Sequence, residues 1–271
     1  MKVRIIVGAV LAAFLLAVLH FGGFVFLIAI SLFAFAATYE TAHITTQHKY
    51  RPLSPPAYVF ALGFPFVYHF AGAVPMFVFY LLCIVAAIMG LVIRRAAEPE
   101  NAIISLLLFA YPLSLLICAL LVYVEFERPL ALTASAFTFA APACTDAFAY
   151  FGGTLFGKRK LCEKISPKKT VEGAVAGLLG GLAFGAALIP LQKLWGGYVG
   201  VPVLLLTGLV CGVCAQFGDL FASMLKRWAG VKDFSSVFPA HGGIMDRIDS
   251  ILLCAPVVLC LFTILRLCGL Y

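Results

Sequence analysis

Residues 199–221 read VGVPVLLLTGLVCGVCAQFGDLF, an apolar run in which Asp219 is the only charged side chain. A helix needs about 20 mostly apolar residues to cross a bilayer, so this run predicts a membrane-spanning helix. The whole chain agrees with this, because 63% of its 271 residues are hydrophobic, only 11% are charged and the mean hydropathy is +1.08. Soluble domains carry roughly 25% charged residues. The sequence therefore predicts an all-α, polytopic integral membrane protein.

The same length criterion places about nine spans along the chain. They lie near residues 3–19, 21–37, 54–72, 74–93, 102–123, 130–150, 173–192, 199–221 and 246–268. The first two are short and share a tight connection at residues 20–23, so we expect a hairpin or one bent unit there. The third contains Pro55, Pro56 and Pro65, and proline disfavours an unbroken helix.

The distribution of basic residues predicts a cytoplasmic N-terminus. With that orientation, 16 of the 19 Lys and Arg residues lie on the inner side, and only Arg128, Lys193 and Arg266 lie outside. Cytoplasmic loops of membrane proteins carry such an excess of positive charge. The two polar segments of the chain, residues 146–173 and 223–249, therefore face the cytoplasm, where nucleotides are found.

Two compositional features argue against other classes of protein. The net charge of +7 is explained by cytoplasmic loops and by contact with anionic lipid or nucleotide, so we expect no nucleic-acid partner. The nine cysteines are scattered, and the C-x-x-C pair Cys211 and Cys214 has no second pair nearby. These cysteines are typical of small apolar packing residues rather than of a zinc or redox site.

Most of the polar chemistry lies in residues 223–249, which read SMLKRWAGVKDFSSVFPAHGGIMDRID. This segment holds four cations and three carboxylates: Lys226, Arg227, Lys232, Arg247, Asp233, Asp246 and Asp249. Cations suit phosphates, carboxylates suit a divalent ion, and glycines allow close backbone approach. The segment therefore indicates a site that handles phosphoryl groups.

Helical spacing groups the acidic residues of this region into two faces. Asp219 shares one face with Ser223 and Lys226, and Asp246 shares another with Asp249. An antiparallel pair of helices could bring Asp219 opposite Asp246 and offer oxygen ligands to Mg²⁺. The alternative for Asp246 and Asp249 is a structural one, because acidic side chains also stabilise a helix N-terminus.

The turn before the last span contains His241, Gly242 and Gly243. The two glycines permit a tight turn and close approach to phosphate oxygens. His241 could act as an acid or a ligand, or could simply be a hydrogen-bonded turn residue.

A first polar segment follows the sixth span. Asp146 lies there among apolar residues, one helical turn before Tyr150. Further on, Ser166 suits a helix N-cap and the next residue, Pro167, suits the first helical position, so residues 166–173 predict a helix start whose two lysines, Lys168 and Lys169, could hold an anion. The trio Lys158, Arg159 and Lys160 could bind substrate or merely anchor the loop to anionic lipid.

These residues closely resemble the phosphatidate cytidylyltransferases, also called CDP-diacylglycerol synthases. The family signature runs S-x-x-K-R, four residues, K-D, then P-x-H-G-G, two residues and D-R-x-D, and it is complete here from Ser223 to Asp249. The upstream residues 146–153 and 166–173 also resemble the family. Residues 1–130 carry no motif of comparable weight.

The resemblance implies that CTP and phosphatidate react to give CDP-diacylglycerol and pyrophosphate with the help of a divalent metal. Mg²⁺ would be held by Asp219 and Asp246, with Asp249 as a ligand or a support, and a second metal ion is left open. The residues expected to be catalytic are Asp219, Asp246, Lys226 and Arg227. Those expected to bind substrate are Ser166, Lys168, Lys169, Ser223, His241, Gly242, Gly243 and Arg247.

The sequence also leads us to expect an organisation and a location. Residues 1–130 would form a scaffold with a lipid or dimer surface, and residues 131–271 would form the catalytic region. The partners would be CTP, phosphatidate and the lipid bilayer, and a homodimer is left open. We expect a multi-pass protein of the inner membrane whose active site faces the cytoplasm.

Two rival functions remain from the sequence. A transporter would carry ions on carboxylates near the middle of the bilayer and often shows internal repeats, but no repeat relates the two halves of this chain. A related CTP-dependent lipid enzyme, such as a polyprenol kinase or an archaeol-type cytidylyltransferase, would differ in the apolar surfaces that select the lipid.

Overall fold

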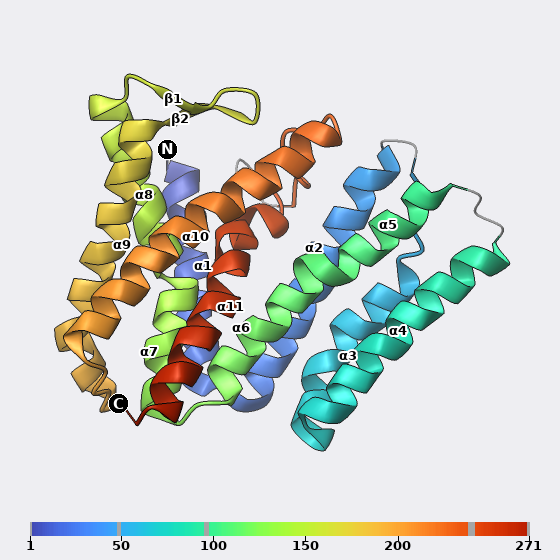
Figure 1. Cartoon of the computed structure of the whole chain (residues 1–271), viewed down its shortest axis with the longest axis horizontal. Helices are drawn as coiled ribbons and strands as arrows, with labels where there is room; N and C mark the ends of the chain where they lie inside the picture. Colours follow the sequence, from blue (N-terminus) through green and yellow to red (C-terminus); the bar gives the residue numbers. More distant parts are fainter. Residues whose placement is uncertain (1, 48–49, 95–97, 238–241, 270–271) are drawn as a thin grey trace. The chain divides into compact units, whose positions relative to one another are not determined.

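The structure is a computed structural model that describes residues 2–47, 50–94, 98–237 and 242–269, and these are almost entirely helical (Figure 1). The α-helices are α1 (Lys2–Phe21), α2 (Gly23–Gln47), α3 (Pro55–Ala71), α4 (Ala73–Ile93), α5 (Pro99–Leu108), α6 (Ser114–Val124), α7 (Arg128–Phe139), α8 (Ala141–Phe156), α9 (Val171–Leu191), α10 (Val201–Trp228) and α11 (Met245–Leu267). A π-helical turn, η1 (Phe109–Leu113), joins α5 to α6, and a 3₁₀ turn, η2 (Gln192–Trp195), follows α9. The two short strands are β1 (Lys160–Cys162) and β2 (Ser166–Thr170).

Six helical segments in the described residues are long and apolar enough to cross a membrane. They are Gly23–Gln47, Ala73–Ile93, Pro99–Val124, Val171–Trp195, Val201–Trp228 and Met245–Leu267. The other three predicted spans correspond to α1, to α3 with its 17 residues, and to the pair α7 and α8. The prediction of a polytopic, all-α membrane protein is confirmed.

Two predicted spans are interrupted where proline occurs. The span at 102–123 is divided by η1, in which Tyr111 has extended backbone angles (φ −147°, ψ 110°) immediately before Pro112. Proline pushes the preceding residue out of the helical region, which explains this break. The span at 130–150 is divided at Ala140, and α8 restarts with Pro142 in its first turn, a position that proline tolerates.

Helix α10 is longer than the sequence predicted. It continues beyond residue 221 to Trp228, and it carries Ser223 and Lys226, as their predicted helix face requires, together with Arg227. No glycine or proline interrupts residues 219–228. The helix ends just before Gly230, whose positive φ of 71° a side-chain-bearing residue would rarely adopt.

The predicted helix start at Ser166 is wrong, because residues 166–170 form strand β2. This strand pairs antiparallel with β1, with Cys162 opposite Ser166 and Lys160 opposite Thr170. Helix α9 begins at Val171, and Thr170 is its N-cap, whose Oγ1 accepts a hydrogen bond from the Gly173 N–H at 3.1 Å. Backbone pairing with β1, which the local N-cap signal does not register, moves the helix start four residues along the chain.

The chain divides into two compact units, and each is discontinuous in sequence. The first contains Met1–Leu120 and Trp228–Arg247, and the second contains Leu121–Arg227 and Ile248–Tyr271. The segment before α11, with its predicted signature residues, therefore belongs to the same unit as helices α2 to α5. The proposed division of roles between residues 1–130 and 131–271 stays a prediction.

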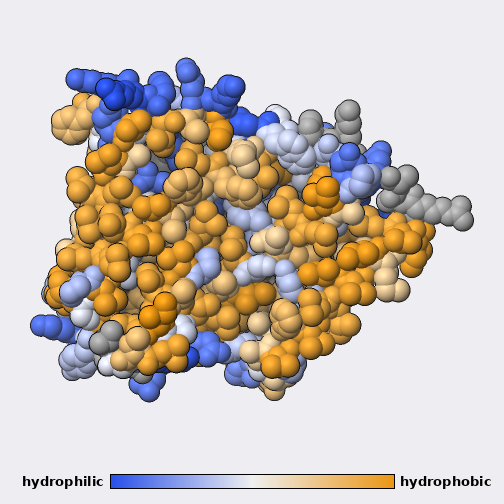
Figure 2. All heavy atoms as spheres, viewed as in Figure 1, coloured by the Kyte–Doolittle hydropathy of each residue, from blue (hydrophilic) through white to orange (hydrophobic). Residues whose placement is uncertain are grey.

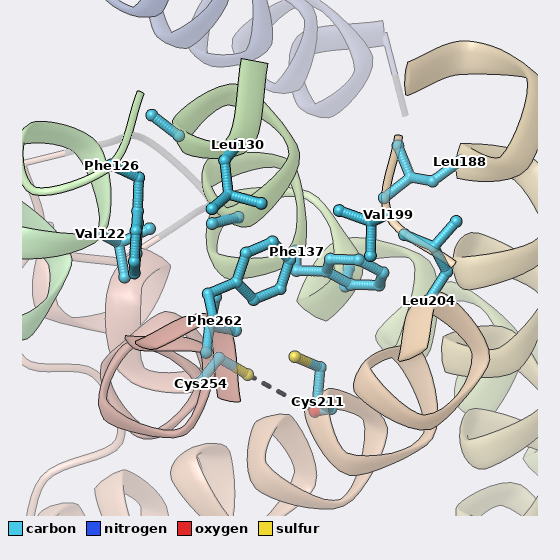
Figure 3. Packing of buried hydrophobic residues seen from close by; sticks show 14 of the residues in the cluster. Val122, Phe126, Leu130, Phe137, Leu188, Val199, Leu204, Cys211, Cys254 and Phe262 are labelled. Atoms are coloured by element: carbon cyan, nitrogen blue, oxygen red, sulfur yellow. Dashed lines mark hydrogen bonds between the residues drawn. The ribbon is translucent and has the colours of Figure 1, made fainter. Parts of the chain in front are cut away.

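The core of the second unit is built around aromatic side chains (Figure 3). Phe137 lies in edge contact with Phe184 and in tilted contact with Phe262, which joins α7 to α9 and α11. The Cys254 thiol of α11 donates a hydrogen bond to the carbonyl of Cys211 on α10, at 3.5 Å. These contacts fix the helices that carry the acidic residues, and both cysteines are packing residues, as predicted.

In the first unit, polar side chains fix the connection between α2 and α3. The Asn101 side chain accepts a hydrogen bond from the Arg51 N–H at 2.7 Å, and the Ser105 hydroxyl accepts one from the Leu53 N–H at 2.8 Å. Both acceptors lie on α5, so residues 51–53 are held against that helix. Phe60 and Phe64 of α3, each fully buried, stack on each other in the core of this unit.

The outer faces of the helices are hydrophobic, as a bilayer requires. On α4 the exposed side chains include Phe77, Leu82, Met89 and Ile93. Figure 2 shows hydrophobic atoms along the sides of the helices and hydrophilic atoms gathered over the β1–β2 hairpin. The apolar surface is explained by contact with lipid tails.

Candidate active site

The predicted face of α10 is present. The Ser223 hydroxyl donates a hydrogen bond to Oδ1 of Asp219 at 3.4 Å, across one turn of the helix. Ser223 and Lys226 are both buried. Lys226 and Arg227 occupy the last turn of α10, where positive charge complements the helix dipole. Three predicted residues, Asp219, Ser223 and Lys226, are therefore aligned on one helix.

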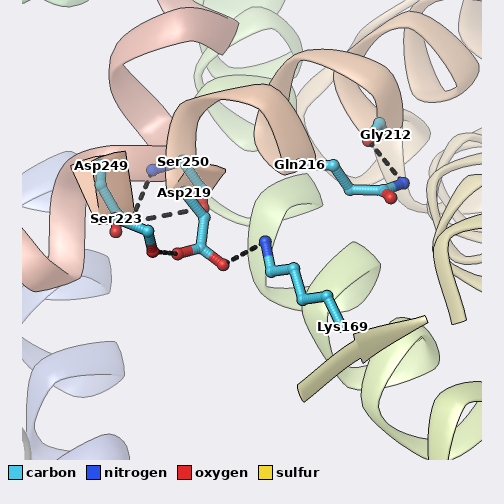
Figure 4. Close-up of polar contacts among 7 residues, drawn as sticks. All are labelled: Lys169, Gly212, Gln216, Asp219, Ser223, Asp249 and Ser250. Atoms are coloured by element: carbon cyan, nitrogen blue, oxygen red, sulfur yellow. Dashed lines mark hydrogen bonds and ion pairs between the residues drawn. The ribbon is translucent and has the colours of Figure 1, made fainter. Parts of the chain in front are cut away.

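An ion pair connects this face to the β1–β2 hairpin. Nζ of Lys169 lies 2.5 Å from Oδ2 of Asp219, and the two side chains are 26% and 29% exposed (Figure 4). Arg227 also reaches the hairpin, because its Nε donates to the carbonyl of Ile165 at 3.4 Å. The structure thus brings together the two polar segments that the sequence placed on either side of α9.

Asp249 lies beside this pair on α11 and is only 7% exposed. Its Oδ1 accepts hydrogen bonds from the Ser250 N–H at 2.7 Å and from the Ser250 hydroxyl at 3.3 Å. The side chain lies within electrostatic range of Asp219, Lys226 and Asp146. Gly218 lets α10 pass close to it, because a Cβ at that position would collide with the Asp249 carbonyl. Two carboxylates, Asp219 and Asp249, therefore share one polar site.

Asp246 serves a different set of contacts, within the first unit. Its Oδ2 accepts hydrogen bonds from the N–H groups of Phe234 at 2.8 Å and Gly243 at 2.9 Å, so it closes the loop that precedes α11. Gly242 has the positive φ (75°) that the predicted tight turn requires. The proposed pairing of Asp246 with Asp219 around a metal ion is untested and stays a prediction.

Glu40 of α2 joins the same loop and was not predicted from the sequence. It is 3% exposed, and its carboxylate accepts hydrogen bonds from the hydroxyl of Ser235 and from the N–H groups of Ile244 and Met245. The only local signal is an acidic residue between apolar stretches, which by itself does not reveal a contact with residues about 200 positions away.

The remaining predicted residues lie around these contacts. Ser166 is half-buried in β2, Lys168 is exposed on the same strand, and Arg247 is exposed in the first turn of α11. Gly243 is buried beside Glu40. His241 lies outside the described residues, so its role stays a prediction.

The donor set is compatible with a magnesium ion. Among the described residues, no three His, Cys, Asp or Glu side chains are grouped as a complete metal site. Mg²⁺ is usually bound by one or two carboxylates, with water and substrate phosphates as further ligands. The carboxylates of Asp219 and Asp249 fit that pattern in residue type, and Asp219 forms an ion pair with the Lys169 ammonium.

Comparison with known proteins reveals similarity along nearly the whole chain. The model of the cytidylyltransferase family matches residues 2–265. A protein of Thermotoga maritima named phosphatidate cytidylyltransferase is 29% identical over 269 residues, which cover 98% of this chain and 97% of that protein.

Shorter segments are more similar. A phosphatidate cytidylyltransferase of Aquifex aeolicus is 47% identical over 112 residues, which cover 41% of this chain and 40% of the relative. One of Brucella abortus biovar 1 is 39% identical over 129 residues, which cover 48% of this chain and 46% of the relative. These two alignments span less than half of each relative.

Proposed function

The chain belongs to the cytidylyltransferase family, and from that premise we propose that it transfers the cytidylyl group of CTP to phosphatidate, giving CDP-diacylglycerol and pyrophosphate. The names of the relatives and the alignment over 98% of this chain support that substrate pair. The structural observation that carries the proposal is the polar site in the second unit. There Asp219 contacts Lys169 and Ser223, with Asp249 close by.

The reaction needs positive charge more than it needs a base. A phosphate oxygen of phosphatidate attacks the α-phosphorus of CTP, a new P–O bond forms, and the bond to the β-phosphate breaks as pyrophosphate leaves. The phosphate monoester has its second pKa at about 6, so the nucleophile is already ionised at neutral pH. The protein must therefore bring two anions together and stabilise the leaving group.

The cations beside Asp219 suit that task. Lys169 lies on the hairpin and Lys226 and Arg227 lie at the end of α10, so phosphates bound between them would be neutralised from two elements. Lys168 would assist from the exposed face of β2. Ser223, Ser166, His241, Gly242, Gly243 and Arg247 are proposed to complete the contacts with substrate.

We propose that Asp219, Asp246 and Asp249 hold Mg²⁺, and a second metal ion is left open. When bound, the ion would supply Lewis-acid stabilisation of the phosphate oxygens. Asp219 and Asp249 contribute carboxylates from α10 and α11, while Asp246 would contribute from the start of α11. Lys169 would hold the Asp219 carboxylate in place in the absence of the ion.

The charge distribution supports a location in the inner membrane with the site open to the cytoplasm. The Lys and Arg residues of the two polar segments belong to the 16 that the orientation places inside. Phosphatidate would enter sideways between helices with its headgroup at the cationic rim. A homodimer stays a prediction.

The decisive test follows whether a radioactive label at the α- or at the γ-phosphate of CTP enters the lipid. Purified protein in detergent receives phosphatidate, Mg²⁺ and CTP labelled at either the α- or the γ-phosphate, and lipids are separated by thin-layer chromatography. Cytidylyl transfer places the α-label in the lipid and releases the γ-label in pyrophosphate, whereas a lipid kinase would place the γ-label in the lipid. EDTA should abolish lipid labelling.

Two variants make this assay specific to the site. Asp219→Asn keeps the side-chain size but removes the charge, and turnover should fall by about 10²–10³. Glu163→Gln removes a carboxylate from the exposed turn of the hairpin and should stay active. Absence of α-labelled lipid with the unaltered protein would refute the proposal. If the α-label of CTP enters lipid when archaeol phosphate is supplied but not when phosphatidate is supplied, the protein would instead be an archaeol-type cytidylyltransferase.

A further inference from the structure

Glu40 is a carboxylate buried on a largely apolar helix. It lies on α2 and is only 3% exposed. Burial of an ionised carboxylate is costly unless hydrogen bonds replace the lost water, so its partners must be strong. A buried carboxylate that costs this much to place usually has a specific task.

In the part of the chain that the structure describes, its hydrogen-bond donors come from Ser235 and from the N-terminal end of α11. Oε1 accepts hydrogen bonds from the Ser235 hydroxyl at 2.6 Å and the Ile244 N–H at 3.0 Å, and Oε2 accepts one from the Met245 N–H at 2.7 Å. The two amides lie at the N-terminus of α11, where backbone N–H groups lack helical partners. Glu40 therefore caps α11 from another helix and also holds residue 235.

A second carboxylate closes the same segment from within. Oδ2 of Asp246 accepts hydrogen bonds from the N–H groups of Phe234 and Gly243. These two residues are the sequence neighbours of Ser235 and Ile244, which Glu40 binds. Residues 234–235 and 243–245 are thus tied to two carboxylates, one from α2 and one from α11.

The glycines of the turn fit these carboxylates closely. A Cβ at Gly243 would collide with both carboxylate oxygens of Glu40. A Cβ at Gly242 would lie 2.6 Å from Oδ2 of Asp246. The close approach that glycine permits in this turn is therefore an approach to the protein's own carboxylates, and Gly243 leaves the space that Glu40 fills.

We propose that Glu40 is a positioning residue for the cytidylyltransferase site: it holds Ser235 and the N-terminal end of α11, and thereby orients Asp246. The inference rests on the proposed function for its kinetic consequence. Glu40 acts through the backbone of Ile244 and Met245 and through Ser235, and needs no contact with CTP or phosphatidate. A misplacement of about 1 Å at a reacting group can cost 10²-fold in rate, so loss of the anchor should be expensive.

The experiment uses the full-length protein in detergent. The variants are Glu40→Gln, which keeps the size but loses the charge, and Glu40→Ala, Gly243→Ala and the double variant. Thr41→Val is the matched control, because Thr41 is buried on the same helix and its hydroxyl donates a hydrogen bond to the Ala37 carbonyl of that helix. Turnover, hydrogen exchange of residues 242–247 and thermal unfolding are measured for each.

We expect Glu40→Gln and Glu40→Ala to lower kcat by about 10- to 100-fold and to speed hydrogen exchange at Ile244 and Met245, while Thr41→Val changes neither. Gly243→Ala alone, with Glu40 still present, should also reduce kcat. In the Glu40→Ala background the colliding carboxylate is gone, so Gly243→Ala should add almost no further loss. Such non-additivity reports a direct contact, which general destabilisation would not produce.

Wild-type turnover and exchange in Glu40→Gln, or full additivity of the two alanine variants, would overturn the inference. If Glu40→Ala does not fold, Glu40→Gln decides. If the unaltered protein forms no CDP-diacylglycerol, the proposed function fails. The anchoring by Glu40 fails as well if hydrogen exchange at residues 244–245 is also unchanged in Glu40→Gln.

Discussion

At the scale of single residues, Lys168 and Lys169 are neighbours in β2 with different surroundings. Successive side chains of a strand point to opposite faces. Lys169 pairs with Asp219 on α10, whereas Lys168 is exposed. The sequence presented two equivalent lysines at a helix start, and the strand separates them.

Replacing these lysines one at a time should therefore give unequal results. Lys169→Ala removes a cation from the proposed phosphate site, and we expect turnover to fall by about 10²–10³. Lys168→Ala should lose far less, and it serves as the matched control because charge and strand are the same. Steady-state kinetics with CTP and phosphatidate check this, and an equal loss in both variants would contradict it.

Local spacing explains which site residues could be predicted. Asp219, Ser223 and Lys226 follow helical periodicity, so their shared face was readable from the sequence. The contacts of Glu40 join residues 195 to 205 positions apart, and no local pattern records such a pairing. The ion pair of Lys169 with Asp219 likewise depends on how the hairpin folds over α10, which required the structure.

At the scale of elements, the hairpin displays a cluster of cations at the end of α8. Glu172 stabilises its base, because Oε2 accepts hydrogen bonds from the N–H groups of Lys158 and Arg159 at 3.0 and 3.2 Å. These bonds use the backbone, and the side chains of Lys158, Arg159 and Lys160 are exposed.

We expect the triple alanine variant of residues 158–160 to lose activity mainly in anionic membranes. Each cation near a negatively charged bilayer contributes about 1 kcal/mol, and salt screens this attraction. Turnover in vesicles of neutral and anionic lipid, at low and high salt, measures the effect, with Lys193→Ala as a control from the opposite side of the predicted topology. A large loss in neutral vesicles would place the trio in the phosphate site.

Helices α9 and α10 approach each other through glycines. A Cβ at Gly181 would collide with the Gly208 carbonyl, and one at Gly208 with the Gly181 carbonyl. Small residues at such positions allow the backbones of membrane helices to pack closely. The contact holds Asp219 of α10 near the helix that follows the hairpin.

Gly181→Ala should destabilise the protein, because overpacking costs about 1–3 kcal/mol. Gly200→Ala is the control, since a Cβ there would meet only Pro202 at 3.9 Å. Thermal unfolding in detergent should show a lower midpoint for Gly181→Ala and little change for Gly200→Ala. Equal midpoints would show that the helices can separate without cost.

At the scale of the whole molecule, the predicted orientation has a direct functional test. Inside-out vesicles should convert added CTP, while sealed right-side-out vesicles should not, because the nucleotide cannot reach a cytoplasmic site through the bilayer. Permeabilising the right-side-out vesicles should restore activity and shows that the enzyme in them is intact. The reverse pattern would invert the topology.

Hydropathy predicted the class of fold but not its division into units. Apolar length identified the helices, since each must cover about the same thickness of bilayer. The breaks near Pro112 and Pro142 follow local backbone rules but were placed only by the structure. The grouping of residues 228–247 with residues 1–120 depends on long-range contacts and could not be predicted from composition.

The order of synthesis matters for a unit assembled in this way. Glu40 leaves the ribosome 195 residues before Ser235 and 205 before Met245. At about 5–20 residues per second, its hydrogen-bond donors arrive roughly 10 to 40 seconds later. During that interval the carboxylate of α2 has to rely on water, lipid headgroups or insertion machinery. The first unit is therefore completed only after translation has passed through residues 121–227 of the second unit.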